Sequence, residues 1–214
     1  MKKPTYALLA LFACAVLPLY AASLDDLTYT TTNGEVAITD CDTDATGELV
    51  IPNTIDGNPV TSIDDDAFEE CSSLTSITIP DSVTSIGTYA FFGCTSLTSI
   101  TIPDSITRIG FRAFLLCGSL TSITIPDSVT SIGRNAFEYC DSLMSITIPD
   151  SVTSIGEMAF LACKSLTAVT FLGDAPKAEN LFDEATPTIY RKPEAKGWGE
   201  TWGGRPVKLI SEKP

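Results

Sequence analysis

The sequence contains no histidine. This absence excludes Ser-His-Asp and Cys-His nucleophile pairs, together with every metal site that needs an imidazole ligand. There is also no phosphate-binding glycine loop and no Cys-x-x-Cys pair. Carboxylates are abundant, but those in the repeated part of the chain occupy equivalent positions, and no pair stands out as a general acid and base. The sequence therefore predicts a protein that is not an enzyme and that has no cofactor or metal site.

Basic residues are scarce. There are 13 lysines and arginines against 27 acidic residues, which gives a net charge of −14. A chain this acidic is repelled by nucleic acid and by anionic membrane surfaces, so neither is an expected partner. A high net charge also keeps an exported protein soluble, which explains the composition without any partner.

Only one long apolar run is present, from Ala7 to Tyr20, and it follows Lys2 and Lys3. Because small residues come next, we expect residues 1–22 to be a secretory signal peptide, and no membrane span after its cleavage. A lipoprotein acylated at Cys14 is the alternative. Phe12 fits that reading poorly, and the apolar run continues past the cysteine.

What the chain does have is a 23-residue period. Three residue types repeat at this step: Cys71, Cys94, Cys117, Cys140 and Cys163; Ile63, Ile86, Ile109, Ile132 and Ile155; Phe68, Phe91, Phe114, Phe137 and Phe160. A fixed period of this size is typical of a solenoid, in which each unit stacks on copies of itself. We expect five or six coils whose phenylalanines, isoleucines and cysteines form continuous interior ladders.

Each unit reads as one coil. Leu74, Ile77 and Ile79 alternate with polar residues, which predicts a short strand with one buried face, and Pro80 ends it. The glycine equivalent to Gly87 in each copy predicts a turn that needs positive φ. The helical spacing from residue 90 to residue 94 predicts a single helical or 3₁₀ turn. The expected fold is a β-rich, right-handed solenoid.

Six cysteines remain after cleavage of the signal peptide, and five share one repeat position. Cysteine packs as a small buried hydrophobe, so we expect free thiols in an interior ladder. Export leaves some disulfide pairing open, and the best candidate pair is Cys41 with Cys71.

The pattern L..I.IP..V..IG..AF..C resembles that of the BspA-type leucine-rich repeats of bacterial surface proteins. The resemblance covers residues 49–172, with an insertion from Ile55 to Pro59 in the first copy and Leu172-Gly173 replacing Pro-Asp in the last. It implies an exported, non-catalytic protein that binds partners or mediates adhesion. Flanking this solenoid, we expect an N-terminal cap over residues 23–48 and a C-terminal cap over residues 173–214. The first contains a β-hairpin at Asn33-Gly34.

The copies differ mainly around the IG..AF..C segment, where large apolar residues gather in the middle of the array. The candidate ligand-binding residues are Tyr89, Phe92, Phe111, Leu115, Leu116 and Tyr139. If exposed, they would form an apolar patch of the kind that marks contact sites. The alternative is that neighbouring coils cover them.

Three other features have weaker functional readings. An aspartate column, defined as Asp81, Asp104, Asp127 and Asp150, either binds calcium weakly or, with the serine after each residue, bonds its own turn. Asp40, Asp42 and Asp44 alternate as in a calcium loop, but Ala45 and Ile51 break the EF-hand pattern. The Ser/Thr strand face, defined as residues 76, 78, 99, 101, 122, 124, 145 and 147, is compatible with ice binding or with ordinary strand preference.

The predicted function is recognition of another protein or a surface glycan through an extended solenoid face. A structural component of the cell envelope is one alternative. Carbohydrate binding at Trp198 and Trp202 is another, although we expect these residues to cover the open end of the core.

Overall fold

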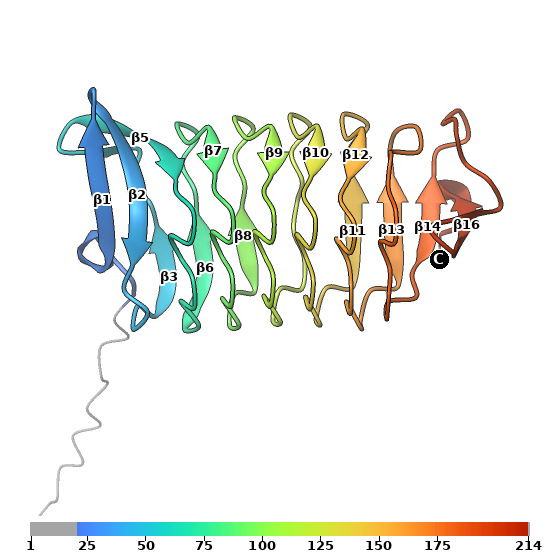
Figure 1. Cartoon of the computed structure of the whole chain (residues 1–214), viewed down its shortest axis with the longest axis horizontal. Coiled ribbons are helices and arrows are strands. Elements are labelled where there is room, and N and C mark those ends of the chain that lie inside the picture. The colour runs from blue at the N-terminus through green and yellow to red at the C-terminus, as the bar shows by residue number, and fades with distance from the viewer. Residues whose placement is uncertain (1–20, 214) are drawn as a thin grey trace, which may run out of the picture.

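The computed structural model describes residues 21–213, and the predicted signal peptide and Cys14 lie largely or wholly outside this range. The chain forms an elongated slab of about seven stacked turns with almost no helix, one turn more than the sequence predicts (Figure 1). The β-solenoid architecture is confirmed.

One line of parallel strands runs along the slab. It consists of β3 (Gly47–Val50), β6 (Leu74–Thr78), β8 (Ser99–Thr101), β11 (Ser145–Ile148), β13 (Ala168–Phe171), β14 (Thr188–Arg191) and β16 (Arg205–Leu209). Ile77 pairs with Ile100, so the register advances by one repeat at each step. Residues 121–126 form no strand, and the line is therefore divided into two sheets between β8 and β11.

A second line is built from shorter strands. It consists of β5 (Asn58–Ile63), β7 (Ser85–Ile86), β9 (Arg108–Ile109), β10 (Ser131–Ile132) and β12 (Ser154–Ile155). The insertion in the first copy forms a small hairpin, in which β4 (Thr54–Ile55) pairs antiparallel with β5. The coils thus contribute strands to two separate sides of the slab, although the coil with β10 has a strand only in the second line and the coils with β14 and β16 only in the first.

The N-terminal segment has the predicted hairpin. After the 3₁₀ helix η1 (Leu24–Asp26), β1 (Leu27–Thr32) pairs antiparallel with β2 (Glu35–Cys41) across a turn where Asn33 and Gly34 have φ of 53° and 81°. Strand β2 then pairs in parallel with β5, which attaches the hairpin to the first coil. Its role as a cap stays a prediction.

The phenylalanine ladder forms the centre of the core. Successive rings from Phe68 to Phe160 stack with centroid distances of 5.2–5.6 Å, and the ladder continues to Phe182 at 5.7 Å. All five repeat phenylalanines are fully buried. The spacing close to the strand separation of about 4.8 Å is what stacking of identical coils requires.

The cysteine ladder is also confirmed. All six described cysteines are buried free thiols, including Cys41 and Cys71. In four coils the thiol donates to the carbonyl oxygen of the core phenylalanine in the preceding coil, for example from Cys94 to Phe68 at 3.2 Å and from Cys163 to Phe137 at 3.0 Å. The thiol therefore packs as a hydrophobe and satisfies a buried carbonyl at the same time.

The prediction of positive φ at the repeated glycine is wrong, because none of Gly87, Gly110, Gly133 and Gly156 lies in the left-handed region. These glycines are required by close contact between coils. A Cβ at Gly133 would lie 2.5 Å from the carbonyl oxygen of Gly110, and one at Gly156 would lie 2.3 Å from the backbone nitrogen of Arg134. A side chain at this position would force neighbouring coils apart.

The prediction of a helical or 3₁₀ turn in each coil is also wrong. Residues 88–94 form two overlapping turns, in which Phe92 N–H donates to Tyr89 O and Cys94 N–H to Phe91 O. Tyr89 and Gly93 have φ of 56° and 71°, and the equivalent positions of the other coils are likewise positive. Left-handed residues interrupt a helix and direct alternate N–H groups to the next coil, as from Tyr89 N–H to Phe111 O at 3.0 Å.

The C-terminal segment continues the long-strand line. Strands β14 and β16 pair in parallel with their predecessors, β15 (Thr201–Trp202) folds back on β16, and the 3₁₀ helix η2 (Ile210–Glu212) follows. Trp198 and Trp202 pack on Phe171 with centroid distances of 4.9 and 5.0 Å. Both indoles are half-buried against the core. The predicted domain boundaries stay predictions.

Candidate functional site

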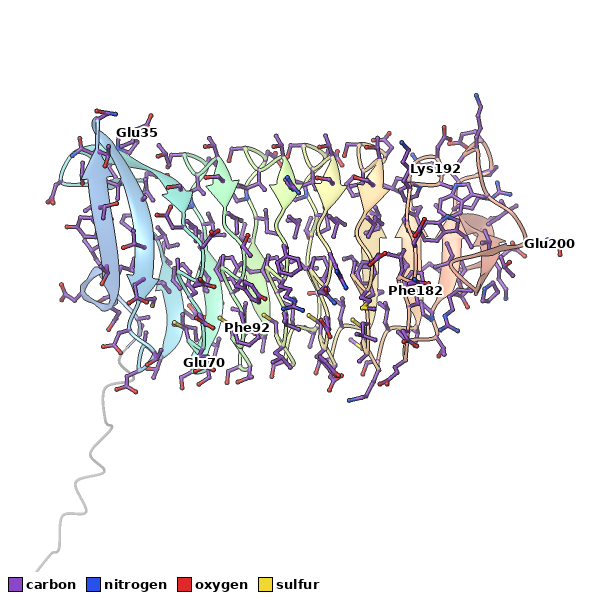
Figure 2. The ribbon with its side chains drawn as sticks, viewed as in Figure 1. Glu35, Glu70, Phe92, Phe182, Lys192 and Glu200 are labelled. Carbon is purple, nitrogen blue, oxygen red and sulfur yellow. The ribbon has the colours of Figure 1, made fainter. Side chains whose placement is uncertain are left out.

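The variable residues of the repeats lie together on one side, which we call the turn surface. It is defined by residues 65–66, 69–70, 88–89, 92–93, 111–112, 115–116, 134–135, 138–139, 157–158 and 161–162. Hydrogen bonds between coils hold these turns in register, such as Glu70 N–H to Phe92 O at 2.7 Å and Leu116 N–H to Glu138 O at 2.9 Å. Figure 2 labels Glu70 and Phe92 near the lower edge of the slab. The variable side chains therefore stand on a rigid, regularly spaced backbone.

An aromatic cluster, defined as Tyr89, Phe92, Phe111 and Arg112, occupies the middle of this surface. The Tyr89 ring meets Phe92 and Phe111 edge to face, with centroid distances of 5.8 and 5.4 Å. The Arg112 guanidinium lies 4.8 Å from the Phe111 centroid and 5.5 Å from that of Tyr89, and it donates to the Tyr89 hydroxyl. Ring contacts and cation–π attraction both stabilise this arrangement of the cluster in the absence of a ligand.

The other three predicted residues take different positions. Leu115 is buried, with 8% of its surface exposed, so it offers little area to a partner. Leu116 and Tyr139 are 40% and 39% exposed, and they occupy the same position in adjacent coils. The structure thus brings Tyr89, Phe92 and Phe111 into contact, and it adds two exposed apolar side chains beside them.

Arg112 is the member of the cluster that is absent from the predicted residues. The signal that could have found it is the 23-residue step, which places Arg112 directly beside Tyr89 on the neighbouring coil. Its Nε atom is buried and has no hydrogen-bond partner, while its Nη1 bonds Tyr89. The guanidinium is therefore held among aromatic rings rather than by a carboxylate.

The strand face offers less for recognition. Threonine side chains beside this face form hydrogen bonds between coils. The hydroxyl of Thr98 donates to Thr75 O at 3.0 Å, and that of Thr167 donates to Met144 O at 3.1 Å. These hydroxyls join successive coils, and the exposed Ser/Thr strand face repeats with little variation. Its proposed ice-binding role stays a prediction.

The serines beside the aspartate column do not bond their own turns, so that expectation is wrong. Ser128 donates to Ile106 O at 2.6 Å and Ser151 to Val129 O at 2.7 Å, and both acceptors belong to the preceding coil. The serine hydroxyl reaches back because the buried carbonyl there needs a donor. The four aspartates of the column are exposed.

Within residues 21–213, no set of three His, Cys, Asp or Glu side chains is arranged to hold a metal ion. In the loop with alternating aspartates, Asp40 accepts from Cys41 N–H and Asp42 accepts from Asp44 N–H, both at 2.9 Å. These carboxylates therefore stabilise their own local backbone. Within the same residues, no helix has the length and apolar character needed to cross a bilayer.

Comparison with known proteins bears on the family. A family model for the BspA-type leucine-rich repeat region matches residues 61–183 with six copies. No curated protein matches the chain.

Solved structures with the same fold include a leucine-rich repeat protein from T. pallidum. It is 31% identical, with a TM-score of 0.67, and the alignment covers 80% of this chain and 86% of that one. A leucine-rich cell surface protein from Faecalibacterium prausnitzii is 36% identical, with a TM-score of 0.66, over 71% of this chain and 39% of that one. A leucine-rich repeat protein from Bacteroides ovatus is 32% identical, with a TM-score of 0.61, over 80% and 50%.

The chain therefore spans half or less of the last two proteins. The repeat period, the stacked coils and the family match lead to one conclusion: this chain belongs to the BspA-type leucine-rich repeat family.

Proposed function

We propose that the chain is an exported, non-catalytic repeat protein that binds another protein through the turn surface. The observation that carries this proposal is the aromatic cluster, where the Tyr89 ring contacts both Phe92 and Phe111 on coils that are otherwise nearly identical. Aromatic side chains and arginine are enriched among the residues that contribute most of the binding free energy of protein interfaces, and aromatic rings bury a large apolar area.

Export is supported by the sequence of residues 1–22 and by a solved structure with the same fold. The F. prausnitzii structure is described as a cell surface protein. The buried thiols fit this location too, since the ladder shields them from oxidants.

The test is affinity capture from an extract of the native environment with wild type and matched variants. Phe92→Ser and Leu116→Ser change the turn surface, whereas Thr101→Ala and Thr124→Ala change the strand face. We expect the first pair to lose the partners that wild type captures and the second pair to keep them. Equal capture by all four variants would contradict the proposal.

A carbohydrate role for the two tryptophans is less well supported. Each indole packs on Phe171, the rings lie 5.2 Å apart, and Trp198 Nε1–H donates to Gly173 O at 3.3 Å. Both indoles are therefore engaged with the core, and the Trp198 N–H that a sugar would need is already bonded. A glycan array comparing wild type with Trp198→Ala tests it directly.

A further inference from the structure

The distribution of charge along the solenoid is unequal, and the aromatic cluster lies where it changes. Residues 23–107 contain 15 acidic and no basic side chains, whereas residues 108–213 contain 12 acidic and 11 basic ones. The net charge is therefore −15 in the first part and −1 in the second. No lysine or arginine of the described chain precedes Arg108.

The acidic side chains closest to the cluster form what we call the acidic margin: Asp65, Asp66, Glu69 and Glu70. All four are exposed. The margin directly adjoins the cluster, because Glu70 N–H donates to Phe92 O at 2.7 Å and Asp66 N–H donates to Thr88 O at 2.9 Å. Asp65 also accepts from Thr88 N–H at 2.6 Å.

The two arginines of the turn surface are already engaged. The Arg112 guanidinium stacks on Phe111 and bonds Tyr89, and Arg134 lies 3.8 Å from Glu157. No described lysine or arginine forms an ion pair with the acidic margin. Four adjacent carboxylates without a counter-charge raise the local negative potential, which a cationic partner would relieve.

The geometry points to the chemistry of the partner: we propose that the turn surface binds a basic polypeptide segment whose apolar side chains contact the aromatic cluster while its lysines or arginines face the acidic margin. This inference rests on the proposed function and specifies its partner class. Apolar contact at Phe92, Leu116 and Tyr139 supplies the buried area, and the margin supplies orientation and a fast, salt-dependent encounter.

The probe is a synthetic peptide of repeated Lys-Lys-Leu-Leu units, titrated against the full mature chain by calorimetry at low and at physiological ionic strength. Two control peptides replace all lysines with glutamate or all leucines with serine. We expect binding of the first peptide, weakened by salt, no binding of the glutamate peptide and much weaker binding of the serine peptide. Absence of binding by the Lys-Leu peptide would overturn the inference.

The protein variants localise the effect. Asp65→Asn, Asp66→Asn, Glu69→Gln and Glu70→Gln together remove four charges from the acidic margin. Changing all four residues of the aspartate column to asparagine removes the same charge from another part of the coils. We expect the first variant to lose affinity by at least about tenfold and to flatten the salt dependence, with little change in the second. Equal losses would reduce the effect to net charge and contradict the inference.

The outcomes separate this inference from the proposed function. If Phe92→Ser abolishes partner capture but the margin variant binds the peptide as wild type does, the turn surface stands and its basic partner is wrong. Melting temperatures within a few degrees of wild type show that each variant is folded. Sedimentation of the chain alone tests whether a second copy of the chain occupies the turn surface. Self-association that is lost in the margin variant would mean that a second copy, and not a basic segment, is the occupant.

Discussion

The interior ladders and the turn surface are built from neighbouring residues of the same seven-residue segment, yet they are used in opposite ways. Phe91 is buried and stacks between two identical rings, and Phe92, the next residue, is half-exposed in the aromatic cluster. The interior position is the same in every coil, whereas the outer one is Glu69, Phe92, Leu115, Glu138 or Leu161. Repetition therefore maintains the interior ladders, and most of the variation between coils falls on side chains outside them.

The largest expected effect comes from the interior. Phe114→Ala removes a fully buried ring that stacks on Phe91 and Phe137, so it should lower the free energy of unfolding by about 3–5 kcal/mol. The matched control is Phe92→Ala, which we expect to cost less than half as much. Chemical denaturation measures both. Similar losses would mean that the interior and the turn surface do not differ in the way described.

Contact between coils gives an intermediate effect. Gly133→Ala places a methyl group 2.5 Å from the Gly110 carbonyl oxygen, so we expect a loss of about 1–3 kcal/mol. Gly118→Ala is the control, because a Cβ there meets nothing within 4 Å. Thermal unfolding of the two variants distinguishes them. A melting temperature of Gly133→Ala equal to that of wild type would show that the coils can move apart at no cost.

The smallest effect concerns one thiol of the cysteine ladder. Burial raises the pKa of Cys163 to about 12 and also raises the pKa of Cys94, Cys117 and Cys140. An unfolded thiol ionises near pH 8.5, so above that pH the unfolded state loses protons that the folded state keeps, and stability falls as pH rises. Each thiol contributes a slope of at most about 1.4 kcal/mol per pH unit.

The measurement is the free energy of unfolding between pH 7 and pH 9.5, compared with Cys163→Ala. The free energy of unfolding of the variant should fall less steeply with pH, because one proton fewer is released on unfolding near pH 9.5. This difference is expected whatever the stability of the variant at pH 7. Identical slopes would indicate that Cys163 is not held protonated by burial, contrary to the buried ladder.

The fold could be predicted from the 23-residue period because stacking makes each interior contact recur at the same step. The repeat period predicts the phenylalanine and cysteine ladders that include Phe114 and Cys94, and the Asn33-Gly34 pair predicts the hairpin. The repeat pattern does not predict the turn geometry. Its left-handed positions are filled by Tyr89, Arg112, Met158 and other residues without a preference for positive φ, because hydrogen bonds to the next coil hold them there.

The candidate site was predicted in part for a related reason. Residue type and the repeat step placed Tyr89, Phe92 and Phe111 close together, and the structure adds their edge-to-face contacts. Burial of Leu115 and the role of Arg112 depend on side-chain directions within the turn, and the sequence pattern does not encode these directions. The continuation of the parallel strands beyond residue 173 was hidden by the loss of the repeat consensus.

Amide hydrogen exchange on the full chain, with and without the bound Lys-Leu peptide, tests most directly whether variation rather than repetition provides recognition. We expect the bound peptide to slow exchange in residues 64–70, 88–93 and 111–116, while residues 98–101 and 121–124 on the strand side remain unchanged. Protection centred on the strand side, with the turn surface unaffected, would contradict the division of the molecule into a stabilising interior and a binding turn surface.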